Sequence, residues 1–113
     1  MPKYIRKTSI KAHCPMEVAL NVISGKWKPF IISMLLKGPQ RPKDLKNDSE
    51  DYTKRVMTQQ LRELEEDGIV SKKVYDELPL RVEYFLTPLG QSLLPVVNEL
   101  RSWGKDYREK RGI

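Results

Sequence analysis

Residues 53–86 read TKRVMTQQLRELEEDGIVSKKVYDELPLRVEYFL, and this stretch decides the fold. Its first half repeats apolar residues at the spacing of one helix face, namely Met57, Leu61 and Leu64. Thr53 suits the cap before such a helix, and Gly68 suits the left-handed residue that follows its end. We therefore predict an amphipathic helix over residues 53–67.

The second half of the stretch predicts a β-hairpin. Residues 69–75 and 81–86 are rich in β-branched and aromatic side chains, and the polar turn between them contains Pro79. A helix followed by a hairpin is the layout of a winged helix-turn-helix, in which the helix enters the major groove of DNA. The expected fold is mainly α with a small β-hairpin wing, which makes it a small α+β domain.

A second face of the predicted helix is basic and polar, and it comprises Lys54, Arg55, Thr58, Gln59 and Arg62. Arginine and lysine reach phosphates and guanine edges, and a glutamine amide can bond the edge of adenine. The alternative is an ordinary solvated helix face. The hairpin offers further DNA-contacting candidates, Lys72, Lys73 and Arg81. Lysines on a hairpin also protect its edges from pairing with other strands, which is the simpler explanation for them.

The composition allows one small domain with a modest core. The chain has 113 residues and a formal net charge of +6, with 32% charged and 39% hydrophobic residues. The positive charge favours a polyanionic partner, because neutralised phosphates release counterions. The single Cys and single His exclude an intrachain disulfide and clustered Cys or His metal sites. We expect a cytoplasmic protein without a cofactor, a metal or a membrane span.

The N-terminal part predicts an arm and a short helix. Residues 1–12 carry scattered basic side chains without an apolar period, which indicates a solvated arm or an arm that contacts DNA. Cys14 and Pro15 suit the cap and the first position of a helix that ends by Gly25.

Two further helical segments precede the central stretch. Residues 27–37 have a broad apolar stripe, and a short helix opens at Pro42. This short helix and the helix over residues 53–67 form the predicted helix-turn-helix.

The C-terminal part predicts one long apolar helix over residues 87–108, bent at Pro95, with a charged tail from Lys105 that frays. Thr87 and Pro88 suit its cap and first position. An apolar face of this length is better used against a second subunit than against the core of a small domain. We expect a homodimer built from the first and last helices, with an interface that includes Val18, Leu93, Val96, Val97, Leu100 and Trp103.

Segments in a fixed order carry a family resemblance: CPME at 14–17, GKWK at 25–28, LRELEEDG at 61–68, and RVEY followed by LTPLG within 81–90. Together they resemble the HxlR-type winged helix-turn-helix regulators of bacteria, relatives of the MarR group, over about residues 12–104. The resemblance implies a homodimer that binds a palindromic operator in double-stranded DNA, usually as a repressor and sometimes as an activator. It also implies that the hairpin is the wing and that the terminal helices form the dimer.

Cys14 is the candidate redox sensor. Several members of the resembled family carry a Cys that senses oxidants or electrophiles at this position, ahead of Pro. Independently, a thiol at a helix N-terminus near Lys11 and His13 is expected to carry more of the reactive thiolate. The alternative is a small buried cap without a regulatory task.

The sequence leaves other functions open. A winged helix can serve as a protein-interaction module without specific DNA binding. A regulator could instead respond to a small molecule in a pocket lined by Trp27, Tyr84 and Trp103, although aromatic residues at such spacing more often form core. An enzyme with Cys14 as nucleophile and His13 as base is disfavoured, because adjacent residues at a helix start rarely face each other.

Overall fold

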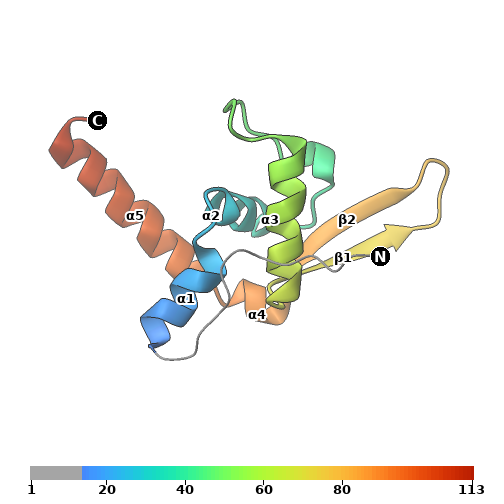
Figure 1. Cartoon of the computed structure of the whole chain (residues 1–113), viewed down its shortest axis with the longest axis horizontal. Helices are drawn as coiled ribbons and strands as arrows, with labels where there is room; N and C mark the ends of the chain where they lie inside the picture. The colour runs from blue at the N-terminus through green and yellow to red at the C-terminus, as the bar shows by residue number, and fades with distance from the viewer. Residues whose placement is uncertain (1–13) are drawn as a thin grey trace.

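The computed structural model describes residues 14–113, so the predicted arm at 1–12 and the neighbours proposed for Cys14, Lys11 and His13, lie outside the described residues. In chain order the elements are α1 (Pro15–Ile23), α2 (Lys28–Leu35), the 3-10 helix η1 (Pro42–Asp44), α3 (Lys54–Glu66), β1 (Val70–Tyr75), β2 (Arg81–Leu86), α4 (Pro88–Gln91) and α5 (Leu94–Arg111) (Figure 1). The predicted fold class, helices with a two-stranded hairpin, is confirmed.

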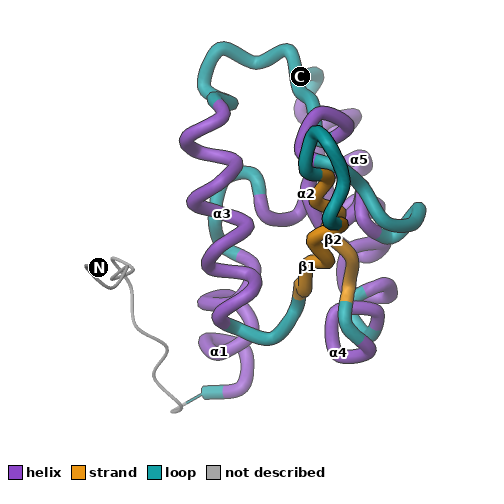
Figure 2. The backbone as a smooth tube through the Cα atoms, turned by 90° about the vertical axis from the view of Figure 1, so that its right-hand side faces the viewer, coloured by secondary structure: helices purple, strands orange, loops and turns teal. Residues whose placement is uncertain are grey.

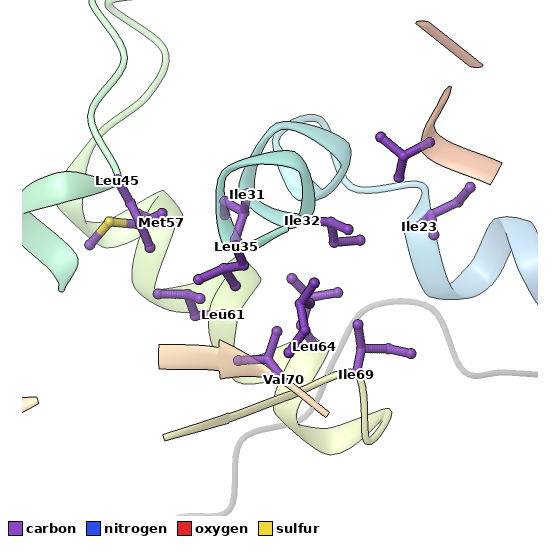
Figure 3. Packing of buried hydrophobic residues seen from close by; sticks show 12 residues of the cluster. Ile23, Ile31, Ile32, Leu35, Leu45, Met57, Leu61, Leu64, Ile69 and Val70 are labelled. Atoms are coloured by element: carbon purple, nitrogen blue, oxygen red, sulfur yellow. The ribbon is translucent and has the colours of Figure 1, made fainter. Parts of the chain in front are cut away.

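The core lies where α2, α3 and the base of the hairpin meet (Figure 3). Ile31 and Ile32 of α2 and Leu64 of α3 are completely buried, and Leu61 is 1% exposed. The buried apolar residues of the described chain are Ile23, Ile31, Ile32, Leu35, Leu45, Met57, Leu61, Leu64, Ile69, Val70, Leu86 and Val97. The predicted inner face of α3 therefore packs in the core as expected.

Both ends of α3 have the local structure that the sequence predicted. The Oγ1 atom of Thr53 accepts a hydrogen bond of 3.1 Å from the backbone N–H of Val56, which satisfies one free donor of the first turn. Gly68 has φ +74°, a left-handed conformation that favours glycine. The chain then turns at once into β1.

The hairpin pairs β1 with β2 in an antiparallel register that runs from Val70 opposite Leu86 to Tyr75 opposite Arg81. Its base is buried and its tip extends away from the body (Figure 1). The backbone of Gln40, just before η1, exchanges two hydrogen bonds with the backbone of Tyr84. These bonds attach the segment before η1 to β2, on the side of this strand that does not pair with β1.

The prediction of a single long helix over residues 87–108 is wrong. The chain forms α4, a turn at residues 92–93, and then α5. Pro95 lies in the first turn of α5, where a missing N–H removes no intrahelical bond, so it begins the helix and does not bend it. The tail predicted to fray is helical to Arg111 and ends at Gly112, which has φ +67°. As a result α5 projects from the body as a straight rod (Figure 1).

Candidate nucleic-acid interface

The outer face of α3 gathers the polar residues that the sequence singled out. Because the inner face packs in the core, the opposite side is turned to solvent, and α3 stands along one side of the molecule (Figure 2). An open hollow of about 630 Å³ is lined by all five candidates from this helix, Lys54, Arg55, Thr58, Gln59 and Arg62. Gln59 is half-buried and the other four are exposed. One helix therefore brings these side chains together on one surface.

The chemistry of this face is that of a cationic, hydrogen-bonding surface. The guanidinium and ammonium groups can bind phosphates, and the amide of Gln59 can both donate to and accept from a base edge. The Oγ1 atom of Thr58 donates a 2.8 Å hydrogen bond to the backbone oxygen of Lys54, so its hydroxyl is oriented with lone pairs still open to a donor.

Two lysines ahead of α3, which are not among the residues predicted from the sequence, extend the basic surface. Lys43 and Lys46 are exposed and line, together with Lys54, a second open hollow of about 560 Å³. Its apolar lining includes Leu45 and Tyr52. The signal for them was their place in the first half of the helix-turn-helix, which crosses the DNA backbone in complexes of this motif.

A carboxylate just before α3 is neutralised within the chain. The Nζ atom of Lys26 donates a hydrogen bond to the Oδ2 atom of Asp51, and both side chains are exposed. The hydrogen bond and the positive charge of Lys26 lower the pKa of Asp51 below its ordinary value. The negative charge of Asp51, which precedes α3, is therefore offset by Lys26 of the turn between α1 and α2.

The two wing lysines, Lys72 and Lys73, lie on opposite faces of the hairpin. Lys72 and Lys73 are exposed neighbours on β1, and neighbours on a strand point to opposite faces of the sheet. The Nζ atom of Lys73 lies 4.7 Å from the centroid of the Tyr75 ring. The hairpin therefore presents at most one of the two lysines to a given partner.

Arg81 is bonded within the hairpin. Its guanidinium carbon lies 3.7 Å from the centroid of the Tyr75 ring. Its Nη atoms donate to Glu77 at 3.0 Å and to Glu83 at 3.1 Å. Arg81 therefore stabilises the stem of the wing in this structure, a use that the sequence did not predict for it.

Comparisons with known proteins decide the class of this domain. The sequence profile of the HxlR-like helix-turn-helix family matches residues 22–112. The chain belongs to the HxlR-like helix-turn-helix family. The HTH-type transcriptional regulator YkvN of Bacillus subtilis (strain 168) is 44% identical to this HxlR-like chain over 100 residues, which is 88% of this chain and 85% of YkvN.

Solved structures agree with this assignment. The redox regulator HypR in its reduced form is 39% identical to the HxlR-like chain and has a TM-score of 0.81, covering 88% of this chain and 98% of HypR. The reduced form of the transcriptional regulator YodB from B. subtilis is 32% identical with a TM-score of 0.72, covering 87% and 97%. The HxlR-like chain is thus a DNA-binding transcriptional regulator with a winged helix-turn-helix, and not an enzyme.

Other site types find little support in the HxlR-like chain. Within residues 14–113, no group of three or more His, Cys, Asp or Glu side chains is arranged to hold a metal ion. In the same range, no helix combines the length and the apolar character that a membrane crossing requires. Of the three aromatic residues considered for a ligand pocket, Trp27 and Tyr84 pack against the core, whereas Trp103 is 68% exposed.

An exposed apolar stripe runs along α5 of the HxlR-like chain, at a spacing of four, three and four residues, and consists of Val96, Leu100, Trp103 and Tyr107. This is the spacing of a helix-pairing seam. The rings of Trp103 and Tyr107 stack with centroids 5.1 Å apart. From Asn98 onward every residue of α5 is exposed in the single chain.

Two residues predicted for the dimer interface, Val97 and Leu93, lie against the protomer's own core in the HxlR-like chain. Val97 is 5% exposed within the protomer's own core, and Leu93 packs against that core. Val18 on α1 is half-buried. Met16 and Leu20 on α1, which were not predicted for the interface, expose 74% and 57% of their surface.

Cys14 lies at the cap position of α1, as predicted, with extended backbone angles of φ −127° and ψ 129°. Its backbone oxygen accepts a 2.9 Å hydrogen bond from Val18, but its thiol makes no capping bond to the helix. The thiol is half-buried and not part of a disulfide.

Proposed function

We propose that this HxlR-like chain acts as a homodimer that places two α3 helices on a palindromic operator and represses the adjacent promoter. The observation that carries the proposal is the division of α3 into a face that is buried in the core and a face with five polar and basic side chains around one open hollow. A helix with these two faces can be fixed by its own domain and still reach base edges in the major groove. The net charge of +6 supplies the attraction to phosphates.

Each part of the basic surface has a proposed role. Arg55, Gln59 and Arg62 read base edges, and Lys54 binds phosphate at the start of α3. Lys43 and Lys46 are added as further phosphate contacts because they border the same end of α3. On the wing, Lys72 is the candidate for a backbone contact, since Lys73 and Arg81 pack on the ring of Tyr75.

The dimer part of the proposal is supported by apolar surface that the protomer leaves uncovered. The α5 stripe and the exposed Met16 and Leu20 of α1 are candidates for a two-fold interface in which each stripe packs against its copy. Two α3 helices related by such an axis fit half-sites about one helical turn of DNA apart, or a multiple of this. A palindromic operator follows from that symmetry.

Selection from a random pool of duplex DNA with the purified chain tests the DNA-binding proposal. We expect an enriched palindrome, whose affinity falls steeply with salt and exceeds that for a scrambled duplex by about 10³-fold or more. Lys54→Ala should weaken binding to the enriched duplex and reduce the slope of log affinity against log salt by about 1, because it removes a phosphate contact. The matched control Lys105→Ala removes an exposed charge from α5 and should leave both unchanged.

The repressor part is tested separately, with a reporter gene placed behind a promoter that contains the enriched duplex. Co-expression of the chain should lower reporter output. Increased output would establish an activator in place of a repressor.

We also propose that oxidation or alkylation of Cys14 modulates DNA binding. Its thiol lies at the start of α1, close in sequence to the exposed Met16 of the proposed dimer surface, and it is not used as a helix cap. HypR, similar over most of this chain, is named a redox regulator. Because the chain has a single Cys, a disulfide must form between subunits or with a small thiol.

Gel shifts with diamide or a quinone test this modulation. The Cys14→Ser variant should bind the enriched duplex as the wild type does and should no longer respond to the oxidant. Placing the thiol at the exposed Ser24, as Ser24→Cys in the Cys14→Ser background, provides the control and should not restore the response. A response that persists in Cys14→Ser would contradict the proposal.

The other interpretations give different results in the same assays. A protein-interaction module would enrich no sequence from the duplex pool. A regulator of the ligand-responsive kind would release its operator on addition of a small molecule in both the wild type and Cys14→Ser.

A further inference from the structure

Residues 25–28 comprise the turn between α1 and α2 and the first residue of α2, and they contact α3 and the loop that precedes it. The sequence of this segment, GKWK, is part of the family pattern, but it belongs neither to the outer polar face of α3 nor to the apolar stripe of α5. We infer that this turn sets the position of α3 relative to the dimer helices and that Lys28 is its main positioning residue. The inference rests on the proposed function and assigns a task to residues outside the five proposed DNA contacts of α3.

Lys28 forms a buried ion pair with Glu63 of α3. The Nζ atom of Lys28 lies 2.6 Å from the Oε1 atom of Glu63, and the two side chains are 3% and 14% exposed. A buried charged lysine costs free energy unless it is paired. Separation of this ion pair would leave a buried charge without a partner, so the pair holds Lys28 and Glu63 in one relative position. Glu63 follows Gln59 by about one helical turn, so the ion pair holds α3 next to a residue of its outer polar face.

The other residues of the turn pack against the same helix or its approach. A Cβ atom at Gly25 would lie 2.1 Å from the Oε1 atom of Gln60, so a larger residue would displace this amide from its position over the turn. The same oxygen accepts a hydrogen bond of 3.4 Å from the backbone N–H of Trp27. Lys26 binds Asp51 in the loop before α3. These contacts fix both the rotation of α3 and its N-terminal end.

The place of the turn in the chain gives these contacts their consequence. The turn begins two residues after Ile23, where α1 ends. Helix α1 carries part of the exposed apolar surface. Movement of α1 in a dimer therefore reaches α3 through residues 25–28. In a two-fold dimer, the spacing of the two reading helices must match the spacing of the half-sites, so the turn determines which duplex fits.

Charge reversal of the buried pair tests the inference. The duplex enriched by the wild type and a scrambled duplex are titrated with Lys28→Glu, with Glu63→Lys and with the double variant, and the ratio of the two affinities is compared. Each single variant should lower the ratio at least tenfold, and the double variant should return it to within about threefold of the wild type. Lys37→Glu, which makes the same charge change at an exposed position at the end of α2, should leave the ratio unchanged.

Circular dichroism at the assay temperature separates positioning from folding. A ratio that is unchanged in the folded single variants, or lowered equally by Lys37→Glu, would overturn the inference. If the single variants unfold, Gly25→Ala replaces them, because it displaces the amide of Gln60 without a change of charge. An unchanged ratio in Gly25→Ala would likewise overturn the inference, and a lowered ratio would support it. Failure of the wild type to enrich any duplex would overturn the proposed function itself, and this inference with it.

Discussion

Truncation of Trp103 on α5 is expected to weaken the dimer and to leave the protomer folded. In the single chain 68% of the surface of Trp103 is exposed, and its ring stacks on that of Tyr107 in the same helix. Surface substitutions of this kind change the free energy of unfolding by no more than about 0.5 kcal/mol. The loss should therefore fall on association between two chains.

The size of the effect follows from the exposed area. A tryptophan can bury about 150–250 Å², so the exposed 68% corresponds to about 100–170 Å² open to a partner. At about 25 cal/mol per Å², complete burial contributes about 2.5–4 kcal/mol for each protomer, and a two-fold interface contains the residue twice. If a partner covers half of the area, Trp103→Ala still weakens association by about 2.5–4 kcal/mol, which is roughly 60- to 1,000-fold.

Sedimentation velocity over a series of protein concentrations measures this change. The wild type should sediment as two chains, and Trp103→Ala should shift to one chain at concentrations where the wild type is still paired. Leu78→Ala is the matched control, because Leu78 is a fully exposed apolar residue at the tip of the wing. Equal association constants for the wild type and Trp103→Ala would refute the reasoning, as would an equal loss in Leu78→Ala.

Three further predictions concern the protomer and use unfolding in urea or by heat. Leu61→Ala should lower the free energy of unfolding by about 2–5 kcal/mol, because its side chain is 1% exposed in the core; a loss below about 1 kcal/mol would contradict the packing. Gly90→Ala should lower the free energy of unfolding by about 1–3 kcal/mol, because the added Cβ would lie 2.2 Å from the backbone oxygen of Ile69. Gly104→Ala adds a Cβ that meets no atom within 4 Å and should stabilise α5. Similar melting temperatures for the two variants would contradict this prediction. Burial raises the pKa of Tyr52 above its ordinary value of about 10, so the folded state favours the neutral phenol. The stability that this side chain contributes is therefore present below about pH 10 and is lost as the pH rises through the raised pKa. Tyr52→Phe should therefore lose less stability than the wild type between pH 9 and about pH 12, and equal losses would contradict this assignment.

The central helix and the hairpin could be predicted because their information is local. Thr53 and Gly68 specify the ends of α3 through contacts within a few residues, and the apolar period specifies its inner face. The polar face follows by geometry, because a helix with one side in the core must turn its other side outward. For these reasons the five candidates on α3 were found together in the structure.

Features that depend on distant contacts could not be predicted in this way. Gly90 approaches the backbone of Ile69 closely, so α4 is a separate short helix against the start of the hairpin and not part of a longer one. The side of α5 that faces the core is set by its packing against α2, which buries Val97 and leaves Trp103 exposed.

The partners of charged residues were also beyond local reasoning. The ion pair between Lys28 and Glu63 joins residues 35 positions apart, and no local pattern indicates it. The packing of Arg81 on Tyr75 depends on the register of the hairpin, which places these two residues opposite each other. A lysine at the start of a largely apolar helix, as in α2, was the one visible sign that a buried charge needs a partner.

Directed cleavage of DNA from the outer face of α3 tests the central claim most directly. Because the chain has a single Cys, a Thr58→Cys variant in the Cys14→Ser background carries one thiol, to which an iron chelate that cuts nearby DNA can be attached. With the enriched duplex we predict two clusters of cuts, symmetric about its centre and about one helical turn apart or a multiple of this. Cuts that are absent, scattered or confined to one side would contradict the account, as would the same pattern from a chelate at Ser102→Cys on α5.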